Sequence, residues 1–162
     1  MIILLIILII VIIYVLAIYN NFIKKLNSVK HAKSSIEVYL TQRFDLIPNL
    51  VECVKAYTKY EEKVLIEIIN LRVEFMNKKE LSKGGMLDKQ INKVILSLEA
   101  YPELKANEQF LNLQKNLTKM ENQIQAARRI YNNEVEKYNN CIDIFPNIFK
   151  FNKQDFFQME EQ

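Results

Sequence analysis

An apolar stretch opens the chain, since residues 1–18 contain no charged side chain. Extended to Ile23, the stretch would form a helix of roughly 34 Å at about 1.5 Å per residue, which is enough to cross a hydrocarbon layer of about 30 Å. The pattern therefore predicts a transmembrane anchor over residues 1–23.

A cleaved secretory signal would also place apolar residues at the N-terminus. However, no Lys or Arg precedes this run, the run is longer than the usual apolar core of a signal, and no small-x-small cleavage pattern follows it. Ala17 stands alone between Leu16 and Ile18. We therefore expect the segment to be retained in the mature protein.

After the anchor, apolar residues recur every three or four positions, as on the buried face of a helix. The first series reaches Arg43 without a Gly or Pro, so this helix is expected to continue straight out of the membrane and to end before Pro48, which suits the first turn of the next helix. A second amphipathic series, residues 50–75, predicts one helix. Residues 82–85, Ser-Lys-Gly-Gly, predict a turn before a shorter helix over about residues 86–100.

The last part of the chain has the clearest period. Residues 101–104, Tyr-Pro-Glu-Leu, predict a break, and five heptads then make roughly 54 Å of helix. We expect this helix to pack in the core, with a coiled coil to a partner as the alternative. The heptad positions are Phe110, Leu117, Ile124, Tyr131, Tyr138 and Phe145, with Leu113, Met120, Ala127 and Cys141 on the second seam.

The charge balance, 22 basic to 19 acidic residues, is too even for a nucleic-acid-binding protein. The basic residues Lys24, Lys25, Lys30 and Lys33 all precede the first acid, Glu37. By the positive-inside tendency, the N-terminus lies outside and the rest of the chain is cytoplasmic. These lysines are also candidates for anionic lipid headgroups, at about 1 kcal/mol each near the surface, although a merely solvated helix face is the alternative.

A search for chemistry finds little. Cys53 and Cys141 are the only cysteines, and in a cytoplasmic domain they are expected to be reduced thiols rather than a disulfide. His31 is the only histidine and is expected at the surface. Gly84-Gly85 lacks the Lys-Ser/Thr of a phosphate loop. The sequence therefore predicts no enzyme, no metal site and no cofactor.

Three blocks carry a resemblance. Residues 43–51 read Arg-Phe-Asp-Leu-Ile-Pro-Asn-Leu-Val, residues 101–111 begin Tyr-Pro-Glu-Leu-Lys-Ala-Asn, and residues 121–146 contain Ala-Arg-Arg, Tyr-Asn and a closing Phe-Pro. In this order behind an N-terminal anchor, the blocks resemble the signatures of the LemA family of bacterial membrane proteins. Lys33 stands where the family usually has Trp, and residues 75–88 show no clear match.

The resemblance implies an all-α fold in which a single N-terminal transmembrane helix is followed by an antiparallel up-and-down four-helix bundle. The predicted breaks independently allow this fold. We expect an anchor over residues 1–23, a cytoplasmic bundle over residues 24–146 and an aromatic tail over residues 147–162. The resemblance implies little about mechanism, because the family is named by sequence. Members of the family have been associated with membrane-protease systems and with intracellular membrane organelles.

The polar and aromatic residues of the signatures are the candidate site residues. We expect a buried network that fixes the helix register, and the alternative is a recognition surface in which Arg128 and Arg129 bind a carboxylate or a lipid phosphate. Asn49 and Asn107 are expected to cap helices or to lie in turns. The candidate positions are Arg43, Asp45, Pro48, Asn49, Glu52, Asn107, Asn122, Arg128, Arg129, Tyr131, Asn132, Tyr138 and Asn139.

The tail is aromatic again, with Phe149, Phe151, Phe156 and Phe157 among charged residues. It could fold back on the bundle, enter the bilayer interface or bind a partner as a short peptide. We expect a non-enzymatic single-pass membrane protein that acts as an adaptor or scaffold for another membrane protein, with self-association left open. The alternative is a membrane-surface module that binds or remodels anionic lipid.

Overall fold

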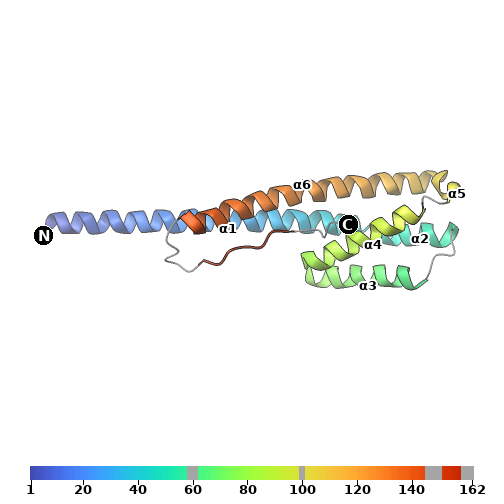
Figure 1. Ribbon diagram of the computed structural model, residues 1–162, viewed down its shortest axis with the longest axis horizontal. Coiled ribbons are helices and arrows are strands. Elements are labelled where there is room, and N and C mark those ends of the chain that lie inside the picture. The colour runs from blue at the N-terminus through green and yellow to red at the C-terminus, as the bar shows by residue number, and fades with distance from the viewer. Residues whose placement is uncertain (58–61, 99–100, 145–150, 158–162) are drawn as a thin grey trace. The chain divides into compact units, whose positions relative to one another are not determined.

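The computed structural model describes residues 1–57, 62–98, 101–144 and 151–157, and all the regular secondary structure in these ranges is α-helix (Figure 1). The all-α prediction is confirmed. The helices are α1 (Ile2–Phe44), α2 (Ile47–Tyr57), α3 (Glu62–Lys78), α4 (Leu81–Leu98), the single turn α5 (Pro102–Lys105) and α6 (Glu108–Ile144).

The chain forms two compact units, and the long helices α1 and α6 contribute to both. The first unit comprises residues 1–34 and 128–156, and the second comprises residues 35–127 and 157–162. The boundaries predicted after residues 23 and 146 divide the chain into an anchor, a bundle and a tail, which is a different division from these two units. They stay predictions.

The N-terminal part of α1 meets the length and composition of a membrane span. An 18-residue window near the N-terminus has a mean hydropathy of 3.5, and none of that window is buried. The predicted anchor is thus a candidate membrane helix, while its orientation across a bilayer stays a prediction.

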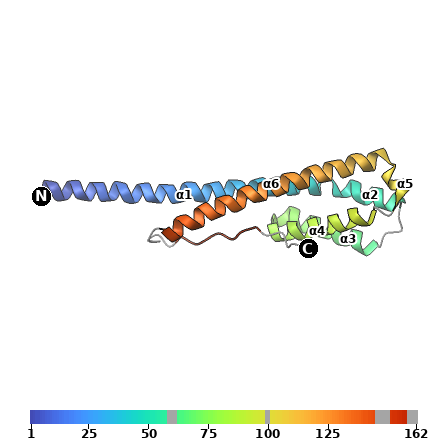
Figure 2. The same ribbon diagram turned by 45° about the horizontal axis from the view of Figure 1, so that its top comes forward.

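In the second unit, the helix direction changes at a place where the local sequence signals are weak. α1 ends at Phe44 as predicted, and Pro48 lies in the first turn of α2. Figures 1 and 2 show that α2 continues in the direction of α1, whereas α3 runs back beside it. The single helix predicted over residues 50–75 is therefore wrong, because α2 ends at Tyr57 and α3 begins at Glu62. No Gly or Pro marks this division, and packing of α2 against α3 outweighs the local helix preference.

The turn between α3 and α4 also differs from the prediction. It lies at Lys79 and Glu80, not at Gly84-Gly85, and α4 begins at Leu81 rather than near residue 86. Lys79 adopts a left-handed φ of 53°, and its N–H donates to the Phe75 carbonyl at 2.7 Å, as in a helix C-cap. Both glycines lie inside α4, where Gly84 is buried.

The helices of the second unit form the expected antiparallel bundle. α2, α3, α4 and the first half of α6 alternate in direction (Figures 1 and 2). The core side chains come from all of them and from the end of α1; the most buried are Ile36, Leu40, Phe44, Ile47, Leu50, Val54, Leu65, Ile68, Phe75, Leu87, Ile91, Val94, Leu98, Phe110, Leu117 and Ile124.

The first unit pairs α1 with the last half of α6. Its buried side chains are Phe22, Val29 and Ala32 on α1, with Tyr131, Val135, Tyr138 and Ile142 on α6. The predicted heptad seam of α6 therefore faces the interior from Phe110 to Tyr138, which confirms core packing; Phe145 lies outside the described residues.

Candidate functional sites

A buried ion pair joins α1 to α4. Arg43, near the end of α1, donates from Nη1 to the Asp88 carboxylate, and both side chains have no exposed surface. Its Nη2 donates to Asn92 Oδ1 at 2.6 Å and to Glu121 Oε2 of α6 at 3.4 Å. One guanidinium thus holds three helices in register, as the expected polar network would.

Sequence reasoning chose Arg43 but missed Asp88 and Asn92. Both lie in or next to the stretch without a signature match. A usable signal existed, because Asp88 lies in the apolar stripe of α4, whose buried positions recur three or four residues apart. A carboxylate on such a stripe requires a buried partner.

Burial raises the pKa of Asp88 to about 6, from an ordinary value of 3.8. The Arg43 charge lowers this pKa, but the Glu121 carboxylate raises it, since two acids share one guanidinium. Within the described ranges, Arg43 Nε and Asp88 Oδ2 have no hydrogen-bond partner. The cluster therefore fixes the helix register at the expense of some stability.

Stability should consequently depend on pH through Asp88. The folded chain holds this proton more tightly than the unfolded chain, so the Asp88 contribution is fully present below about pH 4 and is lost as pH rises through about 6. The free energy of unfolding of wild type minus that of Asp88→Asn should fall by roughly 2 kcal/mol between pH 4 and pH 7. Urea unfolding of both chains in detergent, at several pH values, measures this difference; a difference that rises with pH would contradict the assignment.

A second arginine binds the junction between α1 and α2. Arg72 Nε donates to the Phe44 carbonyl at 2.8 Å, and its Nη2 pairs with Asp45 at 3.2 Å. The Asp45 carboxylate is largely exposed, so this ion pair is worth under about 1 kcal/mol. Asp45 and Pro48 thus belong to the junction between α1 and α2.

A pocket of about 570 Å³ lies between α2 and the start of α6. Asn107 caps α6 as predicted, because its Oδ1 accepts the Phe110 N–H at 3.0 Å. Asn49 is not a cap, since it lies exposed in the third position of α2. Five of the nine lining side chains are amides: the pocket is lined by Leu46, Asn49, Glu52, Cys53, Asn107, Gln109, Asn112, Leu113 and Asn116.

The thiol in this pocket is not an activated nucleophile. Burial raises the pKa of Cys53, and the neighbouring Glu52 carboxylate raises it further. Cys53 and Cys141 are both free, as predicted. Amides are therefore the most frequent hydrogen-bonding groups of the pocket, beside the Glu52 carboxylate and the Cys53 thiol.

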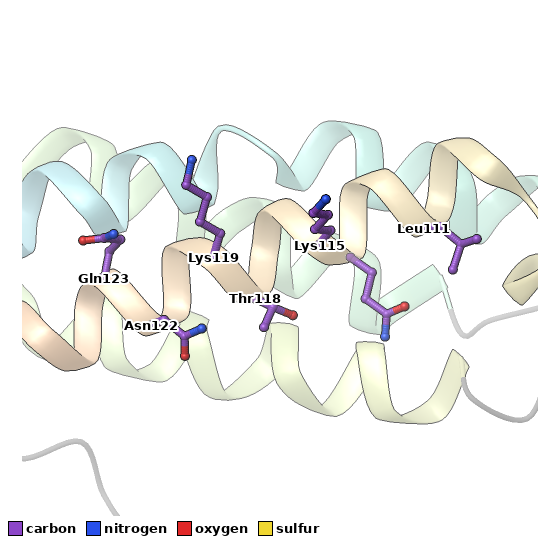
Figure 3. A pocket seen from close by; sticks show the side chains of 7 residues that line it. Leu111, Lys115, Thr118, Lys119, Asn122 and Gln123 are labelled. Atoms are coloured by element: carbon purple, nitrogen blue, oxygen red, sulfur yellow. The ribbon is translucent and has the colours of Figure 1, made fainter.

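Asn122 lies on another surface of α6. It shares a shallow, open hollow with Lys115, Thr118 and Lys119, all on the same helix (Figure 3). Figure 3 shows the two lysines extending from one side of the helix and Thr118 and Asn122 from another. The hollow has no wall from a second helix among its lining residues.

Residues 151–157 of the tail fold back, and residues 151–155 lie along α6. Tyr138 Oη donates to the Asn152 carbonyl at 3.3 Å, and Tyr131 Oη donates to the Asp155 carbonyl at 3.0 Å. Asn139 forms two hydrogen bonds with the main chain of Gln154, both at 2.9 Å, donating to its carbonyl and accepting its N–H. These three signature residues thus bind the chain's own tail.

The other signature residues in the last half of α6 differ in their exposure to solvent. Arg128 and Asn132 are half-buried and Arg129 is exposed. Among the described residues, no group of three or more His, Cys, Asp or Glu side chains could hold a metal ion.

A sequence model described as the LemA family matches residues 32–162, most of the chain. This protein belongs to the LemA family. No curated protein matches the chain. The three LemA-like blocks occupy the junction between α1 and α2, the start of α6, and the last half of α6 with its tail contacts.

The basic residues beyond the anchor mostly precede the LemA match. Lys24, Lys30 and Lys33 are exposed, whereas Lys25 is half-buried. Lys25 lines a pocket of about 340 Å³ between α1 and α6, opposite Lys137, with Ile18, Asn21, Phe22, Asn140 and Cys141. Of the four candidate lipid-surface lysines, Lys25 thus lines a pocket and the other three are exposed.

Proposed function

We propose that this LemA family protein is a non-enzymatic adaptor or scaffold, tethered to the membrane by α1, whose cytoplasmic bundle binds another membrane protein, such as a component of a membrane-protease system. The amide-lined pocket between α2 and α6 is the observation that supports the proposal most. The candidate span and the first helix of the bundle belong to one helix, α1, so no linker separates the tether from the bundle.

The chemistry of the pocket suits a polypeptide partner. Asparagine and glutamine side chains each offer a donor and an acceptor, which matches the alternating N–H and C=O groups of a main chain. Most of the lining side chains are exposed, including Asn49, Asn112 and Asn116, so a partner can reach them without opening the core.

Site-specific cross-linking in intact membranes tests the proposal. A photoreactive residue at Asn112, in the pocket, is expected to capture a discrete membrane protein identified by mass spectrometry, whereas the same residue at Asn70, exposed on α3, is not. Asn49→Arg should abolish the Asn112 cross-link by placing charge and bulk in the pocket, and Asn70→Arg should not. Equal labelling from both positions, or only self and lipid products, would refute an adaptor site in the pocket.

A second candidate function is binding of anionic lipid, which the pocket with Lys25 and Lys137 favours. Two cationic side chains and two amides close to the candidate span suit a lipid phosphate. In nanodiscs, Lys25→Gln should reduce enrichment of labelled phosphatidylglycerol around the full chain, while Lys24→Gln, its exposed neighbour, should not. If both variants reduced the enrichment equally, the lysines would attract anionic lipid only through their general surface charge, and the pocket would not be a lipid site.

A further inference from the structure

We infer that Tyr131, Tyr138 and Asn139 form a binding site for the main chain of an extended polypeptide. The protein's own residues 151–155 occupy the site here. Its other ligand is an extended segment of a partner, with an aromatic residue three positions before the residue that pairs with Asn139. This inference extends the proposed adaptor function, because it names the kind of segment that a partner would supply.

The contacts recognise main chain rather than sequence. All four hydrogen bonds from these side chains end on main-chain atoms, namely the carbonyls of Asn152, Gln154 and Asp155 and the N–H of Gln154. Asn139 satisfies both groups of one residue, as a neighbouring β-strand would. The recognition would therefore be kept if the side chains of the bound segment changed.

The spacing of the site selects an extended chain. Tyr131 and Tyr138 are seven residues apart on α6, which corresponds to roughly 10 Å along the helix axis. Their acceptors, on Asp155 and Asn152, are three residues apart, which also spans roughly 10 Å if the segment is extended. Three residues of helix would span only about 4.5 Å and would not reach both hydroxyls.

The two hydroxyls are suited to donate. Burial raises the pKa of Tyr131 and of Tyr138, so both phenols keep their protons well above neutral pH. A carbonyl oxygen is the acceptor that a fixed O–H donor requires. Main-chain carbonyls of an extended segment supply such acceptors at every residue.

One side chain of the bound segment provides specificity. Phe151 stacks on Phe22 with ring centroids 4.9 Å apart, and its ring lies 6.2 Å from that of Tyr19. In contrast, the side chains of Asn152, Lys153 and Asp155 are exposed, and Lys153 makes only a surface ion pair with Asp143. The site thus reads one aromatic residue and the path of the main chain.

The segment is held weakly enough to exchange. The free-energy gain from the four hydrogen bonds is modest, and the ordering of the chain opposes it. Because the segment belongs to the same chain as the site, it competes with a free peptide at an effective concentration of about millimolar. A free peptide should therefore bind poorly to the wild-type chain and well to a chain whose own segment is disabled.

Gln154→Pro disables the segment without altering the site, because proline lacks the N–H that Asn139 accepts. A fluorescent peptide with the sequence of residues 151–157 is added to full-length chains in nanodiscs, and binding is followed by anisotropy. We expect at least tenfold tighter binding to Gln154→Pro than to wild type. Adding Asn139→Leu should abolish the gain, whereas adding Asn133→Leu, at an exposed position of α6, should not.

Variant peptides separate the possible ligands. A peptide N-methylated at the glutamine should bind at least tenfold more weakly, and peptides that keep only the phenylalanine and scramble the exposed positions should still bind. Failure of Gln154→Pro, shown by circular dichroism to keep its helices, to bind any peptide up to 1 mM would overturn the inference. Binding of the native sequence alone would also overturn it, since the site would then serve only this chain's own tail. These outcomes do not depend on the cross-links from Asn112.

Discussion

Replacing Arg43 by leucine is expected to lower the free energy of unfolding by about 3–5 kcal/mol, because the change leaves the Asp88 carboxylate fully buried without its cation. The loss should be smaller at pH 5 than at pH 8, since Asp88 can then fold as the neutral acid. Urea unfolding of the full chain in detergent, followed by circular dichroism, measures both values.

The double variant Arg43→Leu/Asp88→Leu shows whether the pair itself stabilises the fold. Two leucines remove both buried charges, so this chain should recover most of the loss and lie within about 1–2 kcal/mol of wild type. Lys83→Gln, which breaks an exposed ion pair with Glu74, should change stability by less than about 0.5 kcal/mol and serves as the control. If Arg43→Leu cost no more than Lys83→Gln, the buried cluster would not fix the bundle.

The Arg43 cluster also shows what the sequence could and could not predict. An arginine at the end of a continuous helix marked the cluster, but its partners come from α4 and α6, 45 and 78 residues away along the chain. Helical periodicity describes one face of one helix and does not say which faces meet. The prediction therefore chose one member of the network and missed the carboxylate that it binds.

Local signals succeeded where local chemistry decides the structure. Proline at position 48 begins a helix and Asn107 caps one, because both effects act within a single turn. The division between α2 and α3 lacks such a signal, and packing decides it. The tail site was predicted only in part. Tyr131, Tyr138 and Asn139 were candidate residues and fold-back of the tail was one alternative, but no side-chain pattern marks the main-chain atoms that Asn139 binds.

The second large effect on the free energy of unfolding is expected at one of the two glycines of α4, Gly84. The Ser-Lys-Gly-Gly pattern predicted a flexible turn at both glycines, yet both are helical, and only their surroundings differ. A Cβ on Gly84 would lie 2.8 Å from Leu40 Cδ1 and 3.1 Å from the Phe75 ring, whereas a Cβ on Gly85 would meet nothing within 4 Å. Gly84 is thus required for the close approach of α1, α3 and α4.

Gly84→Val is therefore expected to lower the free energy of unfolding by about 3 kcal/mol, because Leu40 and Phe75 are fully buried and the core must shift to admit the side chain. Gly85→Val, the same change one residue later, should stay within about 0.5 kcal/mol of wild type, since the gain in helix preference meets no clash. Urea unfolding in detergent compares the two chains directly. Equal losses at both positions would mean that flexibility of a turn, rather than close packing, explains the glycine pair. A large loss at Gly84 alone would show that the bundle brings α1 and α3 together over a residue without a side chain.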